Sequence, residues 1–129
     1  MDKNKPRPLS PHITIHRRTQ TAVLSIIHRI TGFGLSIGSI LIVICIFFIA
    51  MGEKYFNIIY FFLGTFLGRV ILLIWSFAIF YHLINGIRYL IWSVGYGINP
   101  RNVSITGYLV IVFSFISTIF IWIIALDLI

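Results

Sequence analysis

His82 lies within an eighteen-residue stretch, Val70 to Ile87, that contains no Asp, Glu, Lys or Arg. An imidazole is costly to place in hydrocarbon, so a histidine in such a stretch points to a function. It can be hydrogen-bonded to a neighbouring helix, or it can be an axial ligand of haem iron. Gly86, four residues further on, shares its helical face and leaves room for a flat macrocycle. No second histidine lies in the apolar stretches, so a six-coordinate haem would need a ligand from another subunit.

A second polar group precedes the first long apolar stretch. Ser25 and Arg29 are four residues apart and share a helix face, with His28 beside them. A hydroxyl and a guanidinium at that depth can hydrogen-bond the carbonyl oxygens of a quinone, and His28 can pass a proton near neutral pH. The alternative is that Arg29 anchors the helix at the membrane edge and that its neighbours are ordinary boundary residues.

Arg88 follows His82 by six residues, at the end of the same stretch. Its guanidinium can pair with a haem propionate or simply mark the membrane edge. The sequence has no glycine-rich phosphate loop, CxxC, HExxH or carboxylate pair. We therefore expect no catalysis by this chain alone.

The elements that hold these residues follow from composition. The chain has 129 residues, of which 59% are hydrophobic and 10% charged, with a mean hydropathy of +1.02. Soluble domains carry about 25% charged residues. Three charge-free stretches of 23, 18 and 25 residues begin at Ile30, Val70 and Asn102, and roughly 20 apolar residues cross a bilayer. The composition predicts an all-α membrane protein with three transmembrane helices. It excludes a soluble enzyme and a nucleic-acid-binding domain, despite the net charge of +7.

We expect one domain, residues 1–129, that begins with a basic, proline-bearing arm at residues 1–20. Residues 52–57 carry the polar residues of a turn, and residues 55–68 would be an interfacial approach to the second span. Gly95, Gly97, Asn99 and Pro100 predict a loop. The three transmembrane helices are expected at about 21–51, 69–92 and 104–126.

The basic residues predict the orientation. Three crossings put eight of the ten Lys and Arg residues on the N-terminal side, and only Lys54 and Arg69 on the other. The N-terminus is therefore expected on the matrix or cytoplasmic side and the C-terminus on the opposite side. The eight are Lys3, Lys5, Arg7, Arg17, Arg18, Arg29, Arg88 and Arg101.

Three motifs resemble those of the large membrane-anchor subunit, cytochrome b556, of the succinate:ubiquinone oxidoreductase (respiratory complex II) family. They are Arg7-Pro8-Leu9-Ser10-Pro11-His12, Ser25-Ile-Ile-His28-Arg29-Ile-Thr31-Gly32 and His82-Leu-Ile-Asn-Gly86-Ile-Arg88. Their order and spacing also agree with the family. The chain departs from the family after Arg88. The family often has His or Phe at the position of Tyr89, and Asp at the position of Ser93.

The resemblance implies specific roles for these residues. His82 would be one axial ligand of haem b, and a small membrane-anchor subunit would supply the other. Ser25 and Arg29 would line the ubiquinone site, and His28, Arg29 and Arg88 would lie near the haem propionates. A flavoprotein subunit with FAD and an iron–sulfur subunit with its clusters would dock on the basic side.

Two other functions stay open at this point. One is a fumarate reductase anchor of the same architecture, and the other is a haem-free structural or assembly anchor in which His82 only packs. The arm motif begins at Arg7, which leaves no room for a targeting presequence and indicates a bacterial gene, an organelle gene or a processed form. The mitochondrial type of the arm and the 28 Ile against 4 Ala favour the mitochondrial inner membrane, with a bacterial inner membrane as the alternative.

Overall fold

The computed structural model describes residues 19–127, so the arm before them lies outside the described residues. Within that range the chain is helical throughout: α1 (Gln20–Ala50), α2 (Glu53–Gly64), α3 (Phe66–Ser93) and α4 (Pro100–Asp127), with no strand among them. The helices α1, α3 and α4 are long and apolar enough to cross a membrane. This confirms the prediction of an all-α membrane protein with three spanning helices.

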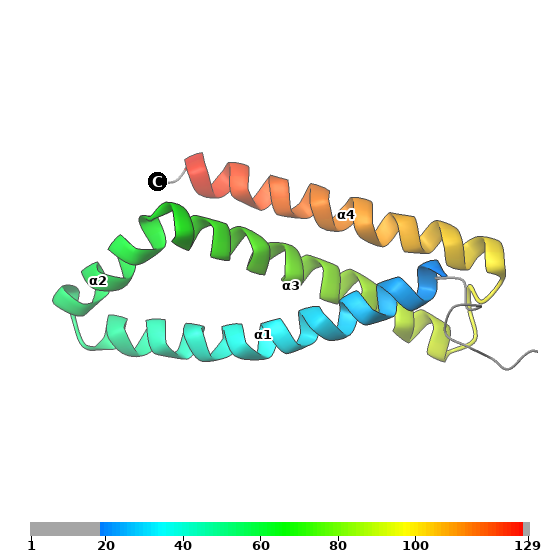
Figure 1. The fold of residues 1–129 in the computed structure, drawn as a ribbon, viewed down its shortest axis with the longest axis horizontal. Coiled ribbons are helices and arrows are strands. Elements are labelled where there is room, and N and C mark those ends of the chain that lie inside the picture. Colours follow the sequence, from blue (N-terminus) through cyan, green and yellow to red (C-terminus); the bar gives the residue numbers. More distant parts are fainter. Residues whose placement is uncertain (1–18, 128–129) are drawn as a thin grey trace, which may run out of the picture.

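The helix α3 lies between α1 and α4 and contacts both (Figure 1). At one end of the bundle α1 crosses α3 closely. Toward the other end the two helices separate, and the short helix α2 joins them (Figure 1). The beginning of α1 and the end of α4 lie at opposite ends of the bundle, as an odd number of crossings requires.

The packed core sits near the end where α1 crosses α3. Leu24, Tyr81 and Val110 come from α1, α3 and α4, and each is at most 2% exposed. The Tyr81 hydroxyl donates a hydrogen bond of 2.8 Å to the carbonyl of Leu24. At the same end the Gln20 amide donates to the carbonyl of Ser104 at 3.2 Å, and the Ser104 hydroxyl donates back to the Gln20 amide oxygen at 2.9 Å. These bonds tie all three long helices together at one end.

The helix α2 differs from the expected interfacial approach. The turn is short, because Gly52 has a φ of +106°, a conformation that favours glycine, and helix resumes at Glu53. The chain then bends at Thr65, whose side chain caps the next helix by accepting from the amide of Gly68 at 3.1 Å. A side chain at Gly68 would meet the backbone of Leu63, so only glycine lets α2 pack this closely on α3. This cap starts α3 at Phe66 rather than at Arg69.

The helix α4 also begins earlier than expected, at Pro100 rather than near Ser104. The side chain of Asn99 accepts a hydrogen bond from the amide of Arg101 at 3.2 Å, as an N-cap does. Proline is well suited to the first position of a helix, because the amide that it lacks would have no partner there. The loop before it is confined to residues 94–99.

Candidate functional site

The close crossing of α1 and α3 brings His28 and His82 together. Their rings are stacked, with centroids 3.9 Å apart and planes 7° from parallel. Tyr89, one of the departures from the family motif, meets the ring of His28 edge-on at 5.1 Å. His28 was expected at the membrane boundary beside Ser25 and Arg29 and, from the resemblance, near the haem propionates. The structure places its ring against the intramembrane histidine.

The hydrogen bonds of His82 fix which ring nitrogen carries the proton. Its Nδ1 lies 3.2 Å from the carbonyl oxygen of His28 and 3.3 Å from the hydroxyl oxygen of Thr31. A carbonyl oxygen can only accept, so Nδ1 must be the donor. The Thr31 hydroxyl already donates to the same carbonyl at 2.9 Å, which leaves its lone pairs for Nδ1. The lone pair of a neutral His82 therefore lies on Nε2, the nitrogen that a metal would bind.

Glycines line the face of α1 and α3 on which this pair lies. A Cβ at Gly32 would come within 2.9 Å of the ring carbon Cε1 of His82, so the imidazole rests directly against the backbone of α1. A Cβ at Gly86 would lie 3.8 Å from Cε1 of His28. Gly86 therefore faces the histidine pair, on the side where the sequence suggested room for a macrocycle.

These features fit a haem ligand site. The Nδ1 of His28 is buried and makes no hydrogen bond within residues 19–127. The described residues therefore leave one polar atom of the pair without a partner. The two imidazoles lie face to face, so their ring nitrogens do not converge on a point between them. That a second ligand comes from another chain stays a prediction.

Ser25 and Arg29 lie on α1 at the same end of the bundle. Ser25 is half-buried and Arg29 is exposed. They flank His28 along the helix, within one turn of it. The hydroxyl and the guanidinium are thus accessible to a molecule that approaches the histidine pair from the membrane edge.

Arg88 lies on a different face of α3. It is only 5% exposed. Its Nε donates to the hydroxyl of Thr106 at 3.0 Å, and one terminal nitrogen donates to the carbonyl of Val103 at 2.8 Å. The other terminal nitrogen donates to the side-chain oxygen of Asn85 at 3.3 Å, and the guanidinium lies 4.0 Å from the centre of the Trp92 ring. In this structure Arg88 joins α3 to α4, and its placement near the propionates stays a prediction.

Thr31 and Asn85 were not among the residues expected at the site. Both stand inside the motifs that resemble the family's, and Thr31 occupies the position where the family has Ser or Thr. Asn85 is fully buried, and an amide three residues before an arginine in a charge-free stretch signals a buried polar contact.

The sequence is similar to known proteins over most of its length. The sequence model of the family described as "Succinate dehydrogenase/Fumarate reductase transmembrane subunit" matches residues 3–121. The succinate dehydrogenase cytochrome b556 subunit of Rickettsia felis is 38% identical over 117 residues, which cover 91% of each chain. The cytochrome b560 subunit of Reclinomonas americana is 35% identical over 134 residues, with 96% of this chain and 90% of the relative covered. The cytochrome b556 subunit of Paracoccus denitrificans is 36% identical over 92 residues, with 71% of each covered.

The chain belongs to the family of succinate dehydrogenase and fumarate reductase transmembrane subunits. It is a cytochrome b membrane anchor of the succinate dehydrogenase complex, complex II, and the oxidoreductase activity is that of the complex. With three spanning helices it is a multi-pass inner-membrane protein.

Proposed function

We propose that this chain binds haem b through Nε2 of His82 and helps to form the site at which ubiquinone is reduced. The observation that carries the proposal is the 3.2 Å contact between Nδ1 of His82 and the carbonyl oxygen of His28. In the tautomer that donates at this contact, the Nε2 lone pair is left for iron. The glycines at 32 and 86 keep side chains away from the histidine pair.

The remaining contacts to the haem divide between this chain and its partners. His28, with its unpartnered Nδ1, and the exposed Arg29 would hold the propionates. The Arg88 guanidinium has five N–H donors, and three of them donate to groups within the chain. The remaining N–H groups would donate to a haem propionate. The small membrane-anchor subunit would supply the second axial ligand. When bound, haem b supplies a one-electron store beside the route to the quinone.

The reduction of ubiquinone needs two electrons and two protons. The electrons would come from succinate through the FAD of the flavoprotein subunit and the clusters of the iron–sulfur subunit. The Arg29 guanidinium would hydrogen-bond one carbonyl oxygen of the quinone and stabilise the negative charge that develops there. The Ser25 hydroxyl would hold the other carbonyl oxygen, and His28 would pass protons from the basic side.

This assignment supports the orientation expected from the charges. The end of the bundle that holds Ser25, Arg29 and Arg101 would face the mitochondrial matrix, or the cytoplasm of a bacterium. The soluble subunits would dock there, on the side from which electrons enter. Of the two membranes, we propose the mitochondrial inner membrane.

The haem assignment is tested by His82→Ala in the assembled complex. We expect the reduced-minus-oxidised absorbance of b-type haem to be lost or strongly lowered, while the subunit is still found with its partners in the membrane. Leu83→Ala is the matched control, because Leu83 is next in the chain and exposed to lipid. An unchanged haem spectrum in His82→Ala would show that another residue binds the iron.

The quinone assignment is tested by Ser25→Ala and Arg29→Ala. The measured quantity is ubiquinone reductase activity divided by the succinate oxidation that an artificial acceptor draws from the soluble subunits. We expect this ratio to fall at least tens-fold, since loss of one donor to a developing oxyanion costs roughly 10²–10³ in rate. Arg29→Lys should restore it only in part, because an ammonium lacks the planar donors of a guanidinium. Arg101→Ala, at the same end, should leave it unchanged. An unchanged ratio in both alanine variants would make Ser25 and Arg29 membrane-edge residues only.

A further inference from the structure

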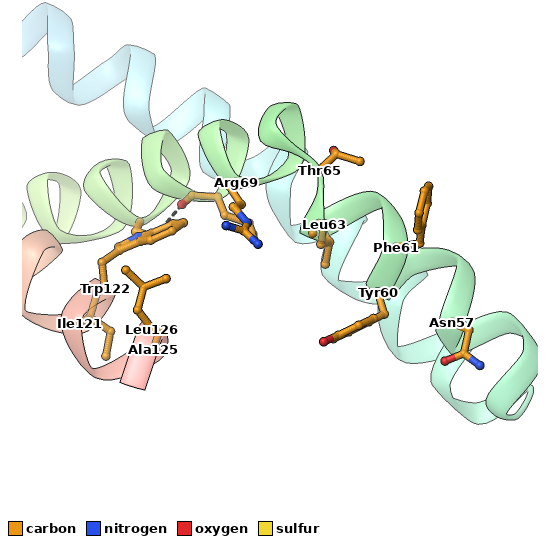
Figure 2. Close-up of a pocket in the computed structure, with 13 residues that line it drawn as sticks. Asn57, Tyr60, Phe61, Leu63, Thr65, Arg69, Ile121, Trp122, Ala125 and Leu126 are labelled. Atoms are coloured by element: carbon orange, nitrogen blue, oxygen red, sulfur yellow. Dashed lines mark hydrogen bonds between the residues drawn. The ribbon is translucent and has the colours of Figure 1, made fainter. Parts of the chain in front are cut away.

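A groove of about 890 Å³ lies at the end of the bundle opposite the histidine pair. It is formed by α2, the beginning of α3 and the end of α4, where α2 joins the separating helices (Figures 1 and 2). Its size is in the upper part of the ~300–1,000 Å³ range of ligand sites. None of the residues assigned to haem or quinone lines it.

The walls of the groove are apolar, with one charge. Leu63, Leu72 and Ile121 are among the aliphatic side chains that line it. Arg69 extends from the first turn of α3 into the space between α2 and α4 (Figure 2). The only hydrogen bond between two side chains drawn in Figure 2 runs from the Trp122 indole to the Ser76 hydroxyl, at 3.2 Å, so the Arg69 guanidinium is not bonded to another side chain that lines the groove.

The position of Arg69 along the helix sets its depth in the bilayer. It stands at the start of a spanning helix, so it lies where hydrocarbon meets the headgroups. Tyr60 and Trp122 line the same groove, and both residue types are enriched at that depth. The N-terminus of α3 also presents the positive end of the helix dipole. The groove therefore combines an apolar channel with a positive charge at the level of lipid phosphates.

We propose that this groove binds one anionic glycerophospholipid, with its phosphate on Arg69 and an acyl chain between α2 and α4. Charge complementarity favours this occupant over an apolar partner helix. Arg69 is exposed, and no acidic residue lines the groove beside it. A phosphodiester offers two oxygens in the geometry that arginine binds. The part of the chain that the structure describes has only two acidic residues, Glu53 and Asp127, and neither lines the groove.

The test uses the assembled complex, stripped of lipid and titrated with phosphatidylglycerol or phosphatidylcholine of identical acyl chains. Native mass spectrometry counts the lipids that remain bound. We expect the wild-type complex to retain one phosphatidylglycerol in preference to phosphatidylcholine. Arg69→Gln should weaken this retention about fivefold or more, the factor that corresponds to roughly 1 kcal/mol for one basic residue at a charged lipid surface. Arg69→Lys should keep most of it.

Two further variants separate the site from its surroundings. Lys54→Gln removes a basic residue that is exposed at the same end of the bundle and does not line the groove, so it should leave retention unchanged. Ala125→Phe places a ring in the groove and should lower the retention of both lipids. Equal retention in Arg69→Gln and wild type, or no preference for phosphatidylglycerol in wild type, would overturn the proposal. So would an Ala125→Phe complex that loses its small anchor subunit while lipid retention is unchanged, because a partner helix would then fill the groove.

Discussion

Changing Gly32 to alanine should displace the His82 ring and weaken binding at the proposed haem site. The new Cβ would lie 2.9 Å from Cε1 and 3.5 Å from Nδ1 of His82. Carbon atoms pack at about 3.5–4.0 Å, so the ring must retreat by roughly 0.6 Å or more. Its Nδ1 hydrogen bonds, at 3.2 and 3.3 Å, are already at the long end for N–H···O and would weaken further. Overpacking of this kind costs about 1–3 kcal/mol, so haem affinity should fall about tenfold or more.

Gly34→Ala is the matched control for this prediction. A Cβ at Gly34 meets nothing within 4 Å, and both glycines lie in the same helix. Each change from glycine to alanine also stabilises the helix by roughly 0.5–1 kcal/mol, and this contribution cancels when the two variants are compared. The assay is the reduced-minus-oxidised absorbance per mole of subunit, measured as haem is titrated into the apo complex. Equal haem affinities in Gly32→Ala and Gly34→Ala would refute the placement of His82 against Gly32.

Three further substitutions test the contacts around the site. Thr31→Val keeps the shape of the side chain but removes a polar contact of His82 Nδ1, so the ligand becomes less basic. We expect the haem midpoint potential to rise by a few tens of mV, about 40 mV per kcal/mol; an unchanged potential would show that the contact is not made in the complex. Tyr81→Phe removes the hydrogen bond to α1 and should lower the free energy of unfolding, measured by detergent titration, by about 0.5–1.5 kcal/mol. An unchanged free energy of unfolding would mean that the bond does not stabilise the bundle. Arg88→Gln leaves buried acceptors on α3 and α4 unpaired and should cost about 1–3 kcal/mol by the same measurement. The exposed Arg101→Gln should cost less than half a kcal/mol, and equal losses would argue against the bridge between α3 and α4.

The three spanning helices could be predicted because charge is excluded from hydrocarbon, whatever the packing. The short helix α2 could not be separated from α3 on that basis. Residues 58–68 are apolar apart from Thr65, and the break at Thr65 depends on one side-chain cap and on close contact between Gly68 and the backbone of α2. The start of α4 had a local signal, since Asn99 before Pro100 is a good N-cap followed by a good first residue.

The candidate site also has features that the sequence predicts and features that depend on how the helices pack. Sequence spacing placed Ser25, His28 and Arg29 on one helix and His82 on another, but the stacking of His28 on His82 depends on where α1 crosses α3. The contact of Thr31 with His82 depends on the same crossing and could not be predicted. That Arg88 and His82 lie on different faces of α3 could have been predicted, because six positions turn a helix by about 240°.

The interhelical bonds of Gln20, Tyr81, His82 and Arg88 all lie toward one end of the bundle, and among the described residues only the bond between Trp122 and Ser76 joins long helices near the other. Bilayers differ in thickness, and a spanning protein must tilt, bend or spread to match the one it occupies. In this chain such adjustment falls on the end where α2 joins α1 to α3, because fewer polar contacts there resist a change of angle. Backbone amides near α2 should accordingly exchange with deuterium faster than those around Leu24. The arrangement of the His28 and His82 rings, at the end with more polar contacts between helices, should then change little with lipid composition.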